Sequence, residues 1–278
     1  MGMDGVATWL ILVRGGHDAA LLALFGALAV PLLMPAEIRP HLAAPLAPRL
    51  AALLGFLLGL AWFLGVAGSV SDAHGPAALF AAVPDFIRFL PFARVLLLRL
   101  VLLAAAFLLA GRPRLTLPCA AAALFCQPWL GHPGEVGPDL IASEMLHLLA
   151  AGLWLGGLAP LLICLGRCAH EAAARAFRRF TFVALPSVVA LAGTGLAQVL
   201  VLTGGAALQA TAYGRIALAK VALLAIALVF ACWNAALLTP RLRRAPDAAA
   251  ALRVSVLIEM ALGLGIVLLA GWLASSAP

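Results

Sequence analysis

Charged side chains are scarce in this sequence, and their scarcity excludes a water-soluble fold. Only 10% of the 278 residues are Asp, Glu, Lys or Arg, whereas a soluble domain carries about 25%. The mean hydropathy of +1.13 is typical of a chain that lies mostly in hydrocarbon. The formal net charge is +7, but the basic residues fall in short clusters between apolar runs. Because they form no single basic face, we expect membrane lipid as the surrounding and no nucleic-acid partner.

Cysteine is too sparse for a disulfide framework. The five cysteines are odd in number and lie mostly inside apolar runs, which leaves soft metal ligands or core packing as their roles. The N-terminal stretch MGMDGVATWLILVRGGHD also lacks the basic region and the small-residue cleavage site of a signal peptide. We therefore expect this first apolar run to be retained as a membrane span.

Eight apolar runs are candidates for transmembrane spans, each of which needs about 20 residues. Pro, Gly and charge clusters separate the runs, as helix breakers do. The fourth run is short and ends in Gln127-Pro128-Trp129. The sequence predicts an all-α integral membrane protein with about eight transmembrane helices, at roughly 6–33, 50–71, 88–110, 115–130, 143–166, 179–202, 214–238 and 252–274.

The arginines predict how these spans are oriented. They gather in the loops after the odd-numbered spans, whereas the opposite loops and both termini hold almost none beyond Arg88. Basic loops stay in the cytoplasm, so both termini should be periplasmic in a multi-pass protein of the bacterial inner membrane. The arginines of the basic loops are Arg39, Arg49, Arg112, Arg114, Arg167, Arg175, Arg178, Arg179, Arg241, Arg243, Arg244 and Arg253.

The two halves of the chain resemble each other. HDAALLALFGALAVPLL, from His17, matches HLLAAGLWLGGLAPLL, from His147, and PFARVLLLRLVLL matches AYGRIALAKVALL. These matches predict a parallel repeat of four spans and four spans, with halves 1–130 and 131–278 related by an axis along the membrane normal. His17 and His147 would then face each other across that axis. Chance likeness between Leu- and Ala-rich helices is the alternative.

Four of the six histidines belong to the outer half of the membrane in this orientation. His17 and His147 lie inside spans one and five, and His74 and His132 lie in the outer loops. Imidazole binds copper, zinc, iron and haem, and its second nitrogen needs an orienting partner. The clustering predicts an outward-facing metal site. Interhelical hydrogen bonding is the alternative role for either buried histidine.

Glu144 precedes His147 by one helical turn, so it is a candidate orienting partner or ligand. Soft donors near the same end are Cys126, Met145, Met1 and Met3. Thiolate and thioether donors with imidazole favour copper. Met145 lies on another face of the helix from His147, so the two do not serve one ion.

The inner end of span five carries a second candidate metal site. In CLGRCAH, Cys164 and Cys168 are one turn apart and His170 follows closely. The spacing is compatible with a metal exit site, and cysteine that simply fills a membrane core is the alternative.

Several charged residues lie within the spans and need partners. Arg99 in span three and Glu259 in span eight have similar depths, which predicts a buried ion pair. Arg94 and Arg215 begin spans three and seven near the outer rim, where their side chains can reach the headgroups.

These residues also carry a family resemblance. GHPGE followed by SEMLHLLAAGLWLGGL, then AYGRIALAK and LRVSVLIEMALGLGIVLLAGWL, resembles the CopD family of inner-membrane copper proteins. The likeness is most specific over 130–278. It implies a multi-span copper-handling protein, often acting beside a small periplasmic copper-binding protein of the CopC type. The positions that match the family pattern are His132, Glu144, His147, Trp154, Gly156, Arg215 and Glu259.

Two departures from that family stand out. Glu144 occupies a position where Asp is expected, and no soluble copper-binding domain is fused to the chain. A partner of the CopC type would therefore be a separate protein.

We interpret the chain as a copper transporter, not an enzyme, with copper captured by His74 and His132, passed to His17 and His147, and released near Cys164 and Cys168. The main alternative is a b-type haem protein with His17 and His147 as axial ligands and Arg94 and Arg215 at the propionates. A structural subunit without any ligand is the third possibility.

Overall fold

The computed structural model describes residues 3–42, 46–204, 209, 211–243, 245 and 247–274, apart from the side chains of residues 3–7. Met1, the side chain of Met3 and Arg244 therefore lie outside the described residues. The described chain is helical throughout, without strands. Its elements are α1 (Met3–Leu32), α2 (Arg39–Leu42), α3 (Leu46–Ser71), α4 (Pro76–Phe89), α5 (Pro91–Leu108), α6 (Pro113–Phe125), η1 (Gln127–Leu130), α7 (Pro133–Val136), α8 (Pro138–Arg167), α9 (His170–Thr203), α10 (Ala212–Trp233), η2 (Asn234–Leu238), α11 (Thr239–Arg241) and α12 (Asp247–Leu273).

Seven helices of the described chain are long and apolar enough to cross a membrane. They are α1, α3, α5, α8, α9, α12 and the continuous run from α10 through η2 to α11. The predicted fourth span is instead α6, a helix of 13 residues followed by the short 3₁₀ helix η1. Pro128 in η1 lacks an amide hydrogen, which prevents α6 from continuing as a regular α-helix. By length and composition, the structure therefore shows seven spanning helices.

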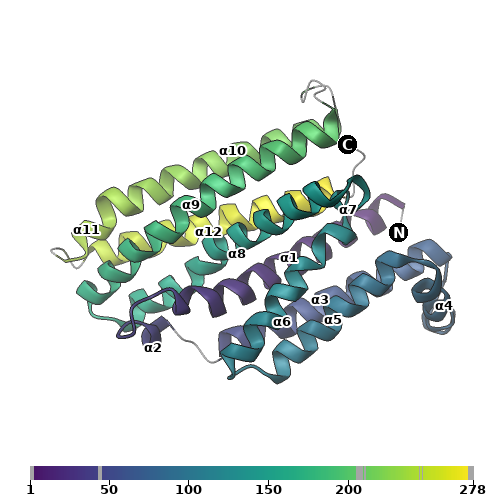
Figure 1. Cartoon of the computed structure of the whole chain (residues 1–278), viewed down its shortest axis with the longest axis horizontal. Coiled ribbons are helices and arrows are strands. Elements are labelled where there is room, and N and C mark those ends of the chain that lie inside the picture. The colour runs from purple at the N-terminus through teal and green to yellow at the C-terminus, as the bar shows by residue number, and fades with distance from the viewer. Residues whose placement is uncertain are drawn as a thin grey trace.

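The two predicted counterparts α1 and α8 form the centre of the bundle. α1 packs against α3, α6, α8 and α12, and α8 packs against α1, α9 and α12. Figure 1 shows α1 between a group formed by α3, α5 and α6 and a second group formed by α8, α9, α10 and α12. The central position explains why α1 and α8 have the largest buried share among the seven candidate spans.

α1 and α8 cross with their backbones in contact. A Cβ atom built on Gly26 would overlap the backbone of Gly156, and one built on Gly156 would overlap the carbonyl oxygen of Leu22. Small residues allow this approach in membrane proteins, where van der Waals packing drives helix association. Gly26 and Gly156 are the glycines that the two similar sequence runs place nine residues after a histidine.

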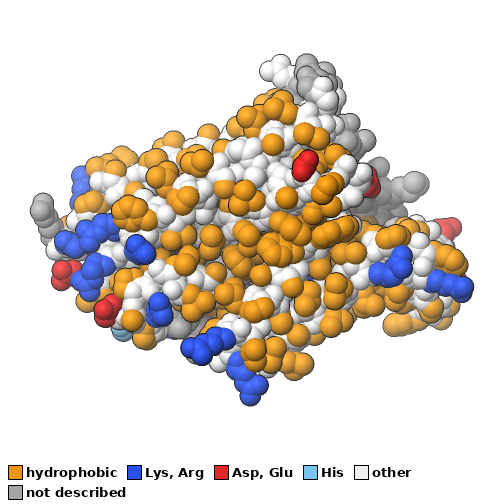
Figure 2. All heavy atoms as spheres, viewed as in Figure 1, with side chains coloured by type: hydrophobic (Ala, Val, Ile, Leu, Met, Phe, Trp, Pro, Cys, Tyr) orange, Lys and Arg blue, Asp and Glu red, His pale blue; other side chains and the backbone are white. Residues whose placement is uncertain are grey.

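Both described termini lie at one end of the bundle, together with α4 and α7 (Figure 1). The opposite end carries α2, α11 and the turns between α5 and α6 and between α8 and α9. Figure 2 shows Lys and Arg side chains gathered mainly at this opposite end, with a smaller group over α4 and the start of α5 and an apolar belt between. We call the end with the termini the outer end and the arginine-rich end the inner end.

Candidate functional site

Two polar clusters lie in the outer half of the bundle, a largely buried one in the first half of the chain and a largely half-buried one in the second half. The Arg99 cluster lies in the first half of the chain and comprises Arg14, His17, Asp18, Arg99, Cys126 and Gln127. The Glu144 cluster lies in the second half and comprises His132, Glu144, His147, Thr194, Gln198, Tyr213 and Lys220.

His147 is held by α9. Its Nδ1 lies 2.8 Å from the Thr194 hydroxyl, and that hydroxyl donates to the carbonyl of Ala190 at 2.6 Å. Because the hydroxyl hydrogen is used in this way, Thr194 accepts from His147, so Nδ1 carries the proton. The Nε2 lone pair is then available to a metal ion, and Thr194 fixes the orientation of the ring.

Glu144 does not orient His147, although it lies one turn away. It interacts mainly with Lys220 of α10 and Gln198 of α9. Its interactions with Asp18 and Arg14 of α1 are weaker. The predicted role of Glu144 as the orienting partner is therefore wrong: Thr194 has that position. The carboxyl group instead joins α8 to α9 and α10 at the outer end.

His132 lies at the rim of the Glu144 cluster. It follows η1, and its ring packs edge-on against Tyr213 of α10, with ring centroids 6.4 Å apart. Tyr213 is buried and interacts electrostatically with Glu144. His132 and Glu144 thus each interact with Tyr213, but over the described residues they do not form with His147 a group that could hold a metal ion.

The buried arginine of the other cluster has a different partner from the predicted one. Arg99 forms an ion pair with Asp18 at 3.1 Å and donates to Gln127 Oε1 at 2.5 Å. Glu259 accepts a hydrogen bond from Asn234. The predicted Arg99–Glu259 pair is wrong because α5 packs against α3 and α6, whereas α12 packs against α1, α8 and α10.

His17 is fully buried and held by α3. Its Nδ1 lies 2.6 Å from the carbonyl oxygen of Gly55, so Nδ1 carries the proton. Gly59 leaves room for the ring, which packs against Trp62 with centroids 5.9 Å apart. Its Nε2 has no hydrogen-bond partner among the described residues.

The two histidines are held by different helices. His17 is directed at α3, whereas His147 is directed at α9. Each Nδ1 is bonded within its own half, and one ion or haem shared between the two Nε2 atoms stays a prediction. The two sites are nevertheless arranged alike, because each histidine bonds the next long helix of its half.

The charges around the two histidines differ. His17 interacts with Arg14 and Arg99 and with only one acid, Asp18. His147 interacts with Lys220, which Glu144 balances. A bound cation is therefore repelled more strongly at His17 than at His147.

The remaining predicted residues are spread over the molecule. His74 is 90% exposed in the α3–α4 turn and pairs with Asp72, and Arg94 and Arg215 are exposed on α5 and α10. Cys126 is buried beside Arg99 and bonds the carbonyl of Ala122. Over the described residues, no three His, Cys, Asp or Glu side chains are grouped as a metal-binding set.

Cys164 and Cys168 meet at the inner end of α8, as their spacing predicts. Their sulfur atoms lie 2.8 Å apart, and both cysteines are free thiols. Cys164 is buried and Cys168 half-buried, so this pair lies between the core and the inner surface. His170 begins α9 next to them and is exposed.

Sequence reasoning did not identify several members of the clusters. Thr194, Gln198 and Asp18 are polar residues inside apolar runs, and that isolation was an available signal. Arg14 also stood in the first run, three residues before His17, as Glu144 stands three before His147. Only the helix neighbours show that these side chains converge.

Comparisons with known proteins agree with the copper resemblance. The N-terminal domain of copper resistance protein D-like proteins matches residues 3–136, and copper resistance protein D matches residues 174–273. Inner membrane protein YebZ of Escherichia coli (strain K12) is 27% identical over 295 residues, covering 98% of each chain. No solved structure matches the chain.

The two family matches together cover the Arg99 cluster and the α9 and α10 side of the Glu144 cluster, whereas Glu144 and His147 lie between the two matched ranges. With the relative and the apolar helices, they show a multi-pass protein of the inner membrane with a function related to copper resistance. On this combined support, the chain belongs to the copper resistance protein D (CopD) family.

Proposed function

We propose that the chain is a transporter that binds copper at the Glu144 cluster and moves it from the periplasm toward the cytoplasm. The observation that carries the proposal is the hydrogen-bond chain from His147 Nδ1 through Thr194 to the carbonyl of Ala190, which leaves Nε2 for a ligand. In this proposal Glu144 and the rim residue His132, which both interact with Tyr213, supply further donors. Imidazole with carboxylate oxygen is a donor set that suits copper.

The path inward runs along α8. His147 lies near the outer end of this helix and Cys164 near the inner end, where Cys168 supplies a second thiol. Thiols bind Cu(I) more readily than the outer oxygen and nitrogen donors do. His17 serves as the corresponding ligand of the first half, with weaker affinity because Arg14 and Arg99 surround it. A separate periplasmic copper-binding protein of the CopC type would deliver the ion.

The haem alternative is less favoured. A b-type haem needs two axial ligands that face one space, whereas the copper proposal needs only His147, whose Nδ1 bonds a different helix from that of His17. Arg94 and Arg215 are exposed at the surface rather than turned toward these histidines.

Copper binding by purified variants tests the proposal. His147→Ala removes the donor atom and should abolish copper binding at the outer site. His17→Ala should cause a smaller loss of copper affinity. Thr194→Val keeps the shape of the side chain but loses the acceptor that orients His147, so copper affinity should fall about 10–100-fold. Competition with a Cu(II) chelator measures these affinities in detergent, because Cu(I) would be bound first by the inner thiols.

His170→Ala, exposed at the inner end, is the matched control and should bind copper like the parent chain at the outer site. Unchanged copper affinity in both His147→Ala and Thr194→Val would contradict the proposed site. A Soret band in the absorption spectrum of the same sample would favour the haem alternative.

We also propose that α6 and η1 together form an eighth crossing and that both termini are periplasmic. The 13 residues of α6 and the four of η1 reach about 28 Å at 1.5 and 2.0 Å per residue, close to the hydrocarbon thickness. The parallel repeat of halves 1–130 and 131–278 requires the same even number of crossings.

Fusions to alkaline phosphatase, which is active only in the periplasm, test this topology. Activity is expected for fusions after Gly137 and at the C-terminus, and none after Arg112 or Cys168. Equal activity after Arg112 and Gly137 would mean that α6 does not cross. Absence of phosphatase activity in the C-terminal fusion would reverse the assignment of outer and inner ends.

A further inference from the structure

A cavity of about 130 Å³ opens between the helices of the second half, away from both polar clusters. Its walls include the aromatic side chains of Trp154, Phe177 and Phe180. Leu185 of α9 and Cys232 of α10 line it and are also exposed on the lipid-facing surface. The mouth therefore opens between α9 and α10 into the hydrocarbon of the membrane.

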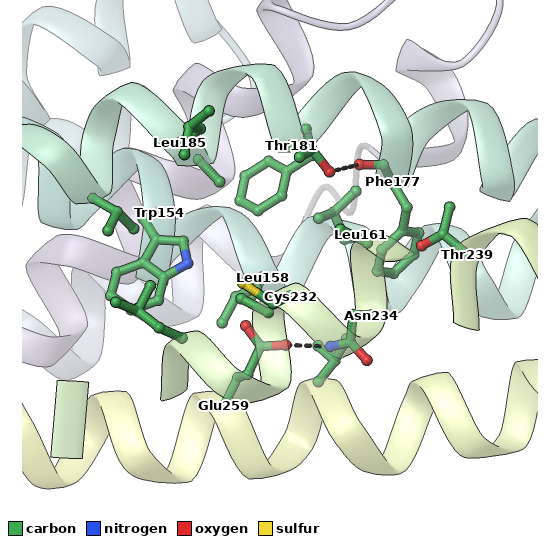
Figure 3. A pocket seen from close by; sticks show the side chains of 17 residues that line it. Trp154, Leu158, Leu161, Phe177, Thr181, Leu185, Cys232, Asn234, Thr239 and Glu259 are labelled. Carbon is green, nitrogen blue, oxygen red and sulfur yellow. Dashed lines mark hydrogen bonds between the residues drawn. The ribbon is translucent and has the colours of Figure 1, made fainter. Parts of the chain in front are cut away.

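One end of this cavity is polar, as Figure 3 shows for Glu259 and Asn234. Asn234 begins the π-helical turn η2 and donates from Nδ2 to Glu259 Oε1. Both side chains are more than nine-tenths buried. The Asn234 Oδ1 atom has no hydrogen-bond partner among the described residues.

An unpartnered buried acceptor is unfavourable in an apolar surrounding, so a ligand that donates a hydrogen bond there would stabilise the structure. π-Helical turns are rare and occur frequently at functional sites. Here η2 places the amide group of Asn234 next to the carboxyl group of Glu259, at the end of the cavity (Figure 3). The polar end thus offers acceptors, and the walls offer aromatic surface.

The volume of the cavity and the position of its mouth further restrict which ligands fit. An engineered apolar cavity of about 150 Å³ holds benzene, so this cavity is suited to a single six-membered ring. A ligand that enters through the mouth between α9 and α10 comes from the hydrocarbon and leaves any tail there. A one-ring headgroup with hydroxyl donors and an apolar tail meets all these requirements.

We propose that this cavity binds the headgroup of a lipid-soluble benzoquinol, with a ring hydroxyl donating to Asn234 Oδ1 beside Glu259. The proposal concerns binding alone and does not depend on the proposed copper site. The oxidised quinone has only acceptor oxygens on its ring, so it cannot donate to the unpartnered Asn234 Oδ1. The reduced form should therefore bind more tightly than the oxidised form.

Binding of decyl-ubiquinol and of decyl-ubiquinone to the full chain in phospholipid nanodiscs tests this inference, by equilibrium dialysis without oxygen. We expect the quinol to bind about tenfold more tightly than the quinone, which corresponds to one hydrogen bond. Glu259→Gln and Asn234→Leu should each reduce or remove this preference. Equal affinity of the parent chain for the two forms would overturn the proposal.

A cavity-filling variant keeps the test independent of the polar pair, whose variants can fail to fold. Ala184→Phe places a ring inside the cavity and should lower quinol affinity at least tenfold. Val189→Phe, on an exposed face of α9 outside the cavity, is the matched control and should bind like the parent. Unchanged quinol binding in Ala184→Phe would overturn the assignment.

Discussion

Asp18→Asn is expected to destabilise the folded protein by about 3–5 kcal/mol, because it leaves the charge of Arg99 buried without its counterion. The two side chains are 3.1 Å apart, with only 1% of the Arg99 side chain exposed. Gln127 would remain as a neutral partner and cannot replace the charge. The measurement is reversible unfolding in mixed detergent micelles, together with the yield of folded protein.

The double variant Asp18→Asn/Arg99→Met removes both charges and should recover most of the loss, since replacing a whole buried pair is often nearly neutral. Glu171→Gln is the matched control: it breaks the exposed pair with Arg175, 3.8 Å away and one turn along α9. Such a pair contributes about 0.5 kcal/mol or less. Equal stability of Asp18→Asn and Glu171→Gln would contradict the pairing of Asp18 with Arg99.

The sequence was sufficient for the helices because hydrocarbon requires long apolar runs with satisfied backbones. It predicted α1, α3, α5, α8, α9, α10 and α12, and it placed the arginines at one end. The fourth run differs from the others because its apolar length is short and it contains proline. The helix there has only 13 residues, fewer than a single spanning helix needs. The family resemblance, most specific over 130–278, extends through the first half.

The partners of the buried polar groups could not be predicted in the same way. Depth along a helix follows from residue count, but the neighbours depend on how the helices pack. Arg99 and Glu259 have similar depths and belong to helices that are not neighbours, so the predicted pair failed. The rings of His17 and His147 likewise follow hydrogen bonds to α3 and α9, which sequence similarity between the halves does not specify.

The cavity at Glu259 shows a third limit of sequence reasoning. The family pattern marked Glu259, but its environment depends on the separation of α9 and α10 and on the π-helical turn η2. Neither feature has a clear signature in an apolar run. Spacing between helices therefore determines which buried polar residues are available to ligands.

Gly156→Ala is expected to destabilise the bundle by at least about 3 kcal/mol, at the upper end of the usual cost of overpacking. A Cβ atom at this position would overlap the carbonyl oxygen of Leu22, a backbone atom that cannot move aside by changing rotamer. α1 and α8 would have to separate, and these helices carry Asp18 of the Arg99 cluster and His147 of the Glu144 cluster. Gly26→Ala should have a similar effect, because its Cβ would overlap the backbone of Gly156.

Gly193→Ala is the matched control for the stability lost in Gly156→Ala, since a Cβ atom at Gly193 meets nothing within 4 Å. It makes the same substitution inside a helix, where alanine is favoured over glycine by up to about 1 kcal/mol, so its stability should equal or exceed that of the parent chain. Thermal unfolding of the three variants, followed by gel filtration in detergent, measures the difference. If Gly156→Ala and Gly193→Ala unfold at the same temperature, the two central helices do not pack backbone to backbone, and the coupling of the two halves through this crossing is wrong.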